Sequence, residues 1–427
     1  MNEAVHVKSL RQLAGTIRVP GDKSASHRAL MISALADGVS TISGISEGHD
    51  VRATRGIVEA LGVAVHEEGS ILYVTGANGG LRGVDRPLQC ENSGTTIRLM
   101  AGVVATIEGR HELVGDESLN RRPMDRIAVP LRRMGAHVVG RGERLFPPLE
   151  VTGRSSLEGI DYEVPEASAQ VKSAVLFAGL AARSPTTVTE TVRTRTTTED
   201  MFRDAGVNIS LRDRDDGRVV TLTPGRPLHH DWSIPGDPSQ AAFFAVLGAL
   251  HRDATIQVSG IDAAPERTGF VDVLARMGAQ VVLIRDGDWY ALSSRSSHLV
   301  ATEIHAREVP SVDEVPILSV AACAASGVTR FRDMAELRLK ESDRFAGSLS
   351  LARSLGCRAW SDGNDFFIEG LGEAQRFQEF SLDAGLDHRM VMAAAVAATA
   401  GRGGTVVGAS TVSSSYPNFF TDLGQLA

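Results

Sequence analysis

The fold is indicated most strongly by the sequence Arg133-Met134-Gly135-Ala136-His137-Val138, which is repeated almost unchanged as Arg276-Met277-Gly278-Ala279-Gln280-Val281. In each copy, a charged amphipathic run ends at a glycine and a short β-like stretch follows. Glycine suits the position just after a helix, because it adopts a positive φ without a steric penalty. Related phrases place glycines at positions 62, 135, 206, 278, 356 and 424. Their spacing of about 70 residues predicts a protein built from six repeats.

Each repeat also contains a run that would form a helix apolar around its whole circumference, and such a helix is buried on all sides. We expect these helices at residues 29–36, 97–105, 171–182, 241–250, 315–325 and 390–400. Short strands accompany them, for example at residues 71–75 and 219–222. The pattern predicts an α/β protein with buried helices at the centre and amphipathic helices and sheets outside, the reverse of the usual barrel.

The six repeats divide naturally into two lobes of three. Residues 232–238, with two prolines and a glycine, interrupt the pattern between the third and fourth repeats, and residues 19–22 are similar. We therefore expect an N-terminal lobe of residues 21–235, inserted into a C-terminal lobe of residues 1–20 and 236–427.

Composition narrows the class of protein. The 427 residues are 43% hydrophobic and 22% charged, which supplies large cores and excludes a disordered chain. No apolar run is long enough for a membrane span or a signal core. The net charge of -8 disfavours nucleic acid as a partner. Cys90, Cys323 and Cys357 follow no disulfide or zinc spacing. We expect a soluble cytoplasmic protein with no membrane or nucleic-acid partner.

Chemically active residues gather where the buried helices are expected to begin. Lys23, Arg28, Arg98 and Lys172 lie there among serines and threonines that can cap helices. A helix N-terminus already carries partial positive charge, so additional cations indicate an anionic ligand.

Loops add further charged residues. Arg122 precedes a helix expected to start at Pro123, and Lys340 and Arg344 share one face if their segment is helical. Asp313 is either a helix cap or, together with Glu341, an acid–base group acting on a multiply anionic substrate. No P-loop, dinucleotide-binding or His-Glu-x-x-His motif occurs, so nucleotide hydrolysis, nicotinamide chemistry and zinc catalysis lack support.

Seven segments resemble, in the same order, the 5-enolpyruvylshikimate-3-phosphate synthase family: residues 21–30, 92–98, 115–123, 168–172, 313–316, 336–344 and 387–390. The resemblance implies a two-lobed inverse α/β barrel of six repeats, which closes over a cleft lined by helix N-termini. It also implies transfer of the enolpyruvyl group of phosphoenolpyruvate to the 5-hydroxyl of shikimate 3-phosphate, with release of phosphate, in the shikimate pathway to chorismate and the aromatic amino acids. A monomer that needs no metal or organic cofactor is expected.

Matching positions imply the roles of individual residues. Shikimate 3-phosphate would contact Lys23, Ser24, Arg28, Ser168, Ala169, Gln170, Arg195, Asp313 and Lys340. Phosphoenolpyruvate would contact Lys23, Gly94, Arg122, Gln170, Arg344 and Arg389. Glu341 would protonate the methylene carbon, while Asp313 and Lys23 are both candidates for the group that accepts the hydroxyl proton.

Four positions depart from residues that are common in the family: Leu99, Thr197, Glu336 and Ser414. We hypothesise that these departures weaken contacts to phosphoenolpyruvate and alter sensitivity to glyphosate. An inhibition curve like that of an enzyme with the usual residues would contradict this hypothesis.

Two alternatives stay open. The sister transferase that acts on UDP-N-acetylglucosamine usually carries a reactive cysteine on the loop matching residues 115–123, where this chain has none. A catalytically silent repeat scaffold that only binds anions would need no acids, whereas Asp313 and Glu341 are present. Turnover that survives mutation of both acids would favour the scaffold.

Overall fold

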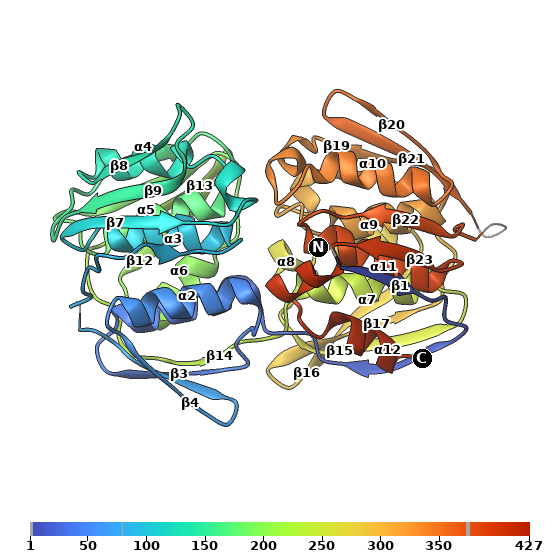
Figure 1. Cartoon of the computed structure of the whole chain (residues 1–427), viewed down its shortest axis with the longest axis horizontal. Helices are drawn as coiled ribbons and strands as arrows, with labels where there is room; N and C mark the ends of the chain where they lie inside the picture. The colour runs from blue at the N-terminus through green and yellow to red at the C-terminus, as the bar shows by residue number, and fades with distance from the viewer. Residues whose placement is uncertain (1–2, 79, 373–375) are drawn as a thin grey trace. The chain divides into compact units, whose positions relative to one another are not determined.

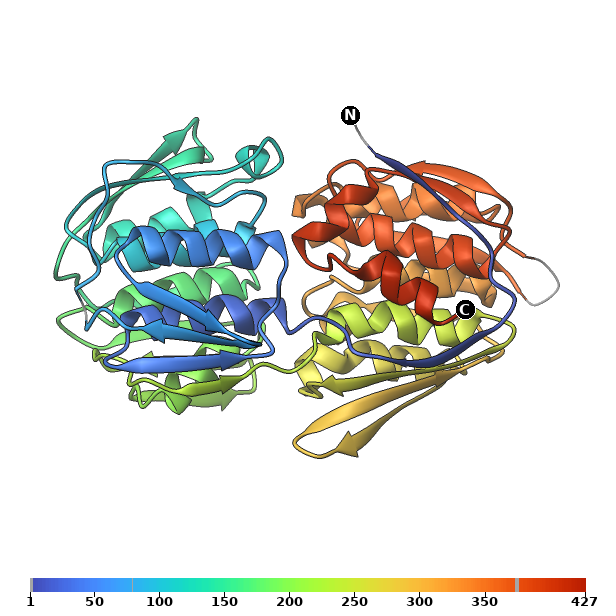
Figure 2. The same cartoon turned by 60° about the horizontal axis from the view of Figure 1, so that its bottom comes forward.

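Figure 1 and Figure 2 show the computed structural model of the chain, which describes residues 3–78, 80–372 and 376–427. The chain divides into two units. The N-terminal unit consists of Gly21–Ile234, and the C-terminal unit consists of Met1–Pro20 together with Pro235–Ala427. The chain therefore contributes to the C-terminal unit both before and after it forms the N-terminal unit.

The first strands lie in the sheets of the C-terminal unit. Strand β1 (Ala4–Val7) pairs antiparallel with β23 (Gly404–Val407), near the other end of the chain. Strand β2 (Leu13–Ile17) pairs in parallel with β15 (Ala254–Ile261). These two pairings tie the first twenty residues to segments that are more than 200 residues away in sequence.

Helices that are apolar on all sides form the centre of each unit, as predicted (Figure 2). Close packing between two of them requires a glycine, because a β-carbon at Gly102 would lie 2.2 Å from the carbonyl oxygen of Ala174. The central helices of the N-terminal unit are α1 (Lys23–Leu35), α3 (Gly94–Val104) and α5 (Ala169–Gly179). Those of the C-terminal unit are α7 (Pro238–Leu250), α9 (Val315–Ala324) and α11 (His388–Ala400).

Small sheets surround the central helices (Figure 1). Within the described N-terminal unit, the strand orders are β14-β3-β5-β4, β6-β7-β9-β8 and β10-β11-β13-β12. In the described C-terminal unit, they are β16-β17-β15-β2, β18-β19-β21-β20 and β1-β23-β22. In each four-stranded sheet, an outer strand pairs in parallel with its neighbour and the other pairings are antiparallel. This recurring order confirms the predicted repeat.

The remaining strands have the following bounds. In the N-terminal unit they are β3 (Val39–Ser43), β4 (Ala64–Glu68), β5 (Ile71–Thr75), β6 (Leu88–Gln89), β7 (Gly109–Val114), β8 (His137–Arg141), β9 (Phe146–Gly153), β10 (Asp161–Val164), β11 (Thr186–Glu190), β12 (Ile209–Arg214), β13 (Gly217–Leu222) and β14 (Asp231–Ser233). In the C-terminal unit they are β16 (Gln280–Asp286), β17 (Trp289–Arg295), β18 (Glu303–His305), β19 (Ser326–Arg332), β20 (Arg358–Asp362), β21 (Asp365–Leu371) and β22 (Phe380–Asp383).

The repeated glycines mostly end amphipathic helices, as predicted. The glycines at 62, 135, 206, 278 and 356 have φ values of 95°, 103°, 75°, 86° and 96°. They follow α2 (His49–Ala60), α4 (Asp125–Arg133), α6 (Thr197–Asp204), α8 (Pro265–Arg276) and α10 (Arg344–Ser354). The sixth glycine differs, because Gly424 lies inside α12 (Phe419–Gln425). The predicted helix stop at Gly424 is therefore wrong.

The central helices are short. The longest of them, α1, α7 and α11, each have 13 residues. Throughout the part of the chain that the structure describes, no helix is both long enough and apolar enough to cross a bilayer.

Candidate active site

The central helices of the N-terminal unit begin with capping side chains. Asp22, Ser93 and Ser168 each accept a hydrogen bond from the backbone N–H three residues later, at 2.8, 3.1 and 3.3 Å. Each cap satisfies one of the N–H groups that a helix start leaves free. The other N–H groups and the positive end of the helix dipole remain at these three starts, where an anion would be stabilised.

Two predicted cations lie on α1. Lys23 Nζ is 2.9 Å from Asp50 Oδ2 on α2. Arg28 is almost fully buried, and its guanidinium donates to Thr198 Oγ1 at 2.6 Å and to Ser173 Oγ at 2.8 Å. Because these two partners lie on α6 and α5, Arg28 links three helices of the N-terminal unit.

The start of α3 leaves room for two guanidinium groups because its first residue is a glycine. A β-carbon at Gly94 would lie 2.8 Å from Arg98 Nη1 and 3.2 Å from Arg122 Nη1. Arg98 donates to Gln170 Oε1 at 2.7 Å, and Arg122 donates to Asn92 Oδ1 at 2.5 Å. Both of these amide partners are neutral. A carboxylate or phosphate group fits such a start.

Arg195 contacts a neutral hydroxyl group, whereas Lys172 is paired with carboxylates. Arg195 lies between β11 and α6, and its Nη1 donates to Ser24 Oγ at 3.3 Å. The side chain of Lys172 is fully buried, with Nζ 2.9 Å from Glu190 Oε2 and 2.6 Å from Glu199 Oε1. The prediction that Lys172 belongs to the anion-binding cations is wrong, because two buried carboxylates already neutralise its charge.

Asp313 is the centre of a second cluster, which lies in the C-terminal unit. Arg344 Nη1 is 3.0 Å and Lys340 Nζ 3.8 Å from Asp313 Oδ1, and Arg389 Nη2 is 3.6 Å from Asp313 Oδ2. The structure thus brings three predicted cations of the C-terminal unit to one predicted acid.

Arg344 extends this cluster to two more carboxylates. Its side chain is fully buried, with Nη2 2.6 Å from Glu341 Oε2 and Nε 2.8 Å from Asp387 Oδ2. Burial alone would lower the pKa of Arg344, but Asp387, Glu341 and Asp313 raise it above its ordinary value. Burial likewise works to raise the pKa of Asp387, yet the neighbouring Arg344 holds that pKa below its ordinary value. The Arg344–Asp387 pair is therefore charged on both sides.

Local structure around this cluster differs from the predictions. Asp313 does not cap α9, which begins at Val315, because its carboxylate faces the cations instead. Lys340 and Arg344 do not share a helix face. Asp343 caps α10 at Arg344, and Lys340 has an extended backbone with φ of -84° and ψ of -159°. Both cations nevertheless approach Asp313.

The helix after Arg122 also starts later than predicted. It begins at Asp125 rather than at Pro123. The Arg122 backbone N–H instead bonds to the carbonyl of Leu119 in the 3-10 helix η1 (Leu119–Arg121). This short turn presents the Arg122 side chain toward α3.

The four departures from the family pattern occupy different surroundings. Leu99 is fully buried in α3, and Thr197 is the first residue of α6, next to the Arg28 partner Thr198. Glu336 lies in the 3-10 helix η3 (Ala335–Leu339). Ser414 ends η4 (Ala409–Ser414), and its hydroxyl donates to the carbonyl of Thr411. The effect of these departures on inhibitor binding stays a prediction.

Two carboxylates that the structure places beside predicted cations were not among the predicted site residues. Asp387 directly precedes the helix of Arg389, so the pattern of an aspartate before an apolar helix could have identified it. No sequence pattern identified Asp50 as a partner of Lys23, because the two residues are 27 positions apart and lie on different helices. Only the tertiary packing of α1 on α2 joins this pair.

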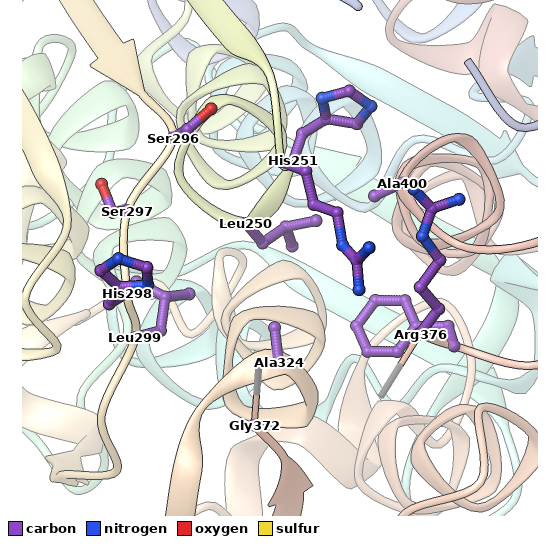
Figure 3. A pocket seen from close by; sticks show the side chains of 12 residues that line it. Leu250, His251, Ser296, Ser297, His298, Leu299, Ala324, Gly372, Arg376 and Ala400 are labelled. Atoms are coloured by element: carbon purple, nitrogen blue, oxygen red, sulfur yellow. The ribbon is translucent and has the colours of Figure 1, made fainter. Parts of the chain in front are cut away.

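A separate cavity of about 370 Å³ lies in the C-terminal unit (Figure 3). Leu250, Ala324 and Ala400 line it, and each is the last residue of a central helix. The cavity is therefore at the opposite ends of α9 and α11 from Asp313 and Arg389, and it includes none of the predicted site residues. Among the described residues, no three His, Cys, Asp or Glu side chains are arranged to hold a metal ion.

Comparison with known proteins gives full-length matches. Residues 7–423 match the family described as EPSP synthase (3-phosphoshikimate 1-carboxyvinyltransferase). The 3-phosphoshikimate 1-carboxyvinyltransferase of Synechococcus sp. (strain WH7803) is 39% identical over 99% of this chain and 98% of its own length. The solved structure of EPSP synthase from Acinetobacter baumannii has a TM-score of 0.85 and 33% identity, and the match covers 99% of this chain and 98% of that one. The enolpyruvyl transferase NikO from Streptomyces tendae shares the fold, with a TM-score of 0.77, 18% identity, and coverage of 100% of this chain and 98% of that one.

Proposed function

Because the chain belongs to the EPSP synthase family, we propose that it transfers the enolpyruvyl group of phosphoenolpyruvate to the 5-hydroxyl of shikimate 3-phosphate and releases phosphate. The observation that carries this proposal is the family match over residues 7–423, a range that includes every predicted site residue. Both substrates carry a phosphate and a carboxylate group, which suits the cations and helix starts described above.

The proposed contacts to phosphoenolpyruvate combine free N–H groups with cations. The closeness of Arg98 and Arg122 to Gly94 supports an anion at the start of α3. In the C-terminal unit, an incoming anion would compete with Asp313 for the nearby cations. The proposed set is Lys23, Gly94, Arg122, Gln170, Arg344 and Arg389.

The proposed contacts to shikimate 3-phosphate come largely from α1, α5 and the segment before α6. The meeting of Arg195 with Ser24 supports a phosphate position at the start of α1. Arg28 would act mainly by holding this region together, since Thr198 and Ser173 already take two of its donors. The proposed set is Lys23, Ser24, Arg28, Ser168, Ala169, Gln170, Arg195, Asp313 and Lys340.

The reaction needs a base and an acid. The 5-hydroxyl oxygen attacks C2 of phosphoenolpyruvate, its proton passes to the base, and C3 takes a proton from the acid to give a tetrahedral intermediate. Loss of phosphate from C2 and of a proton from the new methyl group then restores the double bond. We assign the protonation of C3 to Glu341, and the acceptance of the hydroxyl proton to Asp313 or Lys23.

The ion pair between Glu341 and Arg344 bears on this assignment. In the structure, Arg344 Nη2 lies 2.6 Å from Glu341 Oε2, and a carboxylate in such an ion pair has no proton to donate. An anionic substrate at Arg344 would share that guanidinium and so weaken its hold on Glu341. Substrate binding would therefore prepare Glu341 to carry the proton that C3 receives.

Phosphate release from the purified protein tests the function. Release that requires both phosphoenolpyruvate and shikimate 3-phosphate is expected, with neither substrate sufficient alone. Release with UDP-N-acetylglucosamine as the acceptor would instead assign the chain to the sister transferase. Absence of release with either acceptor would contradict the proposal.

We further propose that the enzyme acts as a cytoplasmic monomer, without a nucleic-acid or membrane partner. The net charge of -8 supports the exclusion of nucleic acid. The thiols of Cys90, Cys323 and Cys357 are all free and buried, which fits a reducing compartment. The scheme above needs no metal or organic cofactor.

A further inference from the structure

Three charged side chains are closed off from solvent inside the N-terminal unit. Lys172 on α5 contacts Glu190 at the end of β11 and Glu199 on α6, and the exposed fractions of these side chains are 0%, 2% and 0%. Taking charges out of water is costly, and burial raises the pKa of Glu199 in spite of the opposing effect of Lys172. None of the three residues belongs to the proposed substrate contacts. Their role is therefore not explained by direct binding.

The lysine ammonium contacts two carboxylates and one backbone carbonyl. Its Nζ donates hydrogen bonds to Glu190 Oε2 at 2.9 Å and to the carbonyl of Arg195 at 3.1 Å. Glu199 Oε1 lies 2.6 Å away as an ion-pair partner, without a hydrogen bond to Nζ. The two carboxylates thus hold Lys172 in place, and one of its donors fixes the backbone of Arg195.

The segment around Arg195 has no regular secondary structure of its own, since it lies between the end of β11 and the start of α6. Glu190 also accepts a hydrogen bond from the hydroxyl of Thr194, and Arg218 donates to the carbonyl of Thr194 at 3.5 Å. Side chains from neighbouring elements therefore hold this segment. The Arg195 guanidinium extends from this segment and donates a hydrogen bond to the Ser24 hydroxyl at the start of α1.

We propose that Lys172 is a positioning residue for shikimate 3-phosphate, which sets the place of the Arg195 guanidinium through the Arg195 carbonyl. This inference rests on the proposed function, because it takes Arg195 as a contact to the phosphate of that substrate. Glu190 and Glu199 take part only by orienting the Lys172 ammonium. A hydrocarbon side chain at position 172 would fill the same space but leave the Arg195 carbonyl without its donor.

Lys172→Met tests the inference, because it keeps much of the side-chain volume and removes the donors. Its effect on binding is measured by titration calorimetry with shikimate 3-phosphate alone. We expect binding to weaken between about tenfold and a hundredfold, as for the loss of a hydrogen bond to a charged group. In steady-state assays, the KM for phosphoenolpyruvate should stay within about twofold of wild type.

A double-mutant cycle separates positioning from a general loss of structure. If Lys172 acts through Arg195, then Lys172→Met should weaken binding no more than about twofold further in an Arg195→Gln background. Full additivity of the losses of shikimate 3-phosphate binding caused by Lys172→Met and Arg195→Gln would overturn the inference. An equal rise of the KM for shikimate 3-phosphate and the KM for phosphoenolpyruvate in Lys172→Met would also overturn it. As a matched control, Glu158→Gln removes the exposed pair with Arg183 in the same unit and should leave binding unchanged.

Glu199→Gln covers the case in which Lys172→Met does not fold. This variant keeps the shape of the side chain and removes one of the two charges that orient Lys172. Weakening of shikimate 3-phosphate binding by threefold or more, lost in the Arg195→Gln background, would support the inference. Unchanged binding would overturn it.

The two proposals fail in different ways. A wild-type protein that releases no phosphate contradicts the proposed function, whatever Lys172→Met does. A wild-type protein that is active, and whose binding of shikimate 3-phosphate is indifferent to Lys172→Met and Glu199→Gln, contradicts only the role of Lys172.

Discussion

The two units pair the charges of their proposed site residues in different ways. In the N-terminal unit, the guanidinium groups of Arg28, Arg98 and Arg122 meet hydroxyl and amide oxygens, which are neutral. In the C-terminal unit, Arg344 meets carboxylates, including those of Asp313 and Asp387. These contacts of the three N-terminal arginines are with neutral groups, whereas Arg344 is paired with carboxylates. Lys23 in the N-terminal unit follows the second pattern, because it is paired with Asp50.

This difference indicates a division of labour. A positive field at helix starts stabilises bound anions but moves no protons. Carboxylates beside cations can exchange partners when a substrate anion arrives, and such an exchange changes their proton affinity. The helix starts of the N-terminal unit therefore suit binding of anions, and the carboxylates of the C-terminal unit suit proton transfer.

Asp313→Asn should have the largest effect and tests where the proton acceptor lies. If Asp313 is the base, kcat should fall by about 10³-fold, within the range for loss of a general base. Lys23→Met should then mainly raise the KM values. Steady-state phosphate release measures both variants. A kcat loss of this size in Lys23→Met, with Asp313→Asn still active, would place the acceptor in the N-terminal unit.

Arg344→Gln should cost the most stability. The fully buried carboxylate of Asp387 would lose its partner, and breaking a buried ion pair in this way costs about 3–5 kcal/mol. Urea unfolding measures the change in free energy. A loss of less than about 1 kcal/mol in the free energy of unfolding would show that Asp387 does not depend on Arg344 to balance its charge.

Arg122→Gln should separate binding from stability in the N-terminal unit. The hydrogen bonds of Arg122 to Asn92 and Ser118 are with neutral groups, and their loss should lower the free energy of unfolding by only about 1 kcal/mol. The KM for phosphoenolpyruvate should rise about tenfold or more. Calorimetric unfolding and steady-state kinetics on the same preparation provide the measurement. A stability loss as large as that of Arg344→Gln would remove the contrast between the units.

The smallest expected effect concerns pH. Burial, followed by the charges of Lys23 and Arg28, lowers the pKa of His27 well below its ordinary value of 6.5. Below about pH 6.5, His27 therefore binds a proton in the unfolded chain but stays neutral in the native state. Stability falls as the pH falls, by up to about 1.4 kcal/mol per pH unit.

His27→Asn removes this dependence and can keep a hydrogen bond to Thr54. Unfolding free energies at pH 6.5 and 5.5 should differ by about 1 kcal/mol less in the variant than in wild type. Identical pH dependence of the two proteins would show that folding does not lower the pKa of His27.

The predictions succeeded where a few neighbouring residues carry the signal. The central helices were predicted near their observed bounds, because an all-apolar circumference can be read within a dozen residues. Gly94 and Arg122 were identified by resemblance to a family motif, and the structure brings them together. Lys172 was misread, because nothing near it in sequence shows that Glu190 and Glu199 lie against it.

The six repeats, the buried helices and most of the glycine helix stops could be predicted from the sequence, because periodicity and positive φ are local properties of the chain. The sequence also indicated the chemistry, since cations at helix starts are costly without an anion. The pairing of particular charges depends on the tertiary structure. Arg344 pairs with Asp313 and Asp387, which lie 31 and 43 residues away. Coulomb energies and hydrogen bonds depend on distances in space, and no local pattern in the chain specifies those distances.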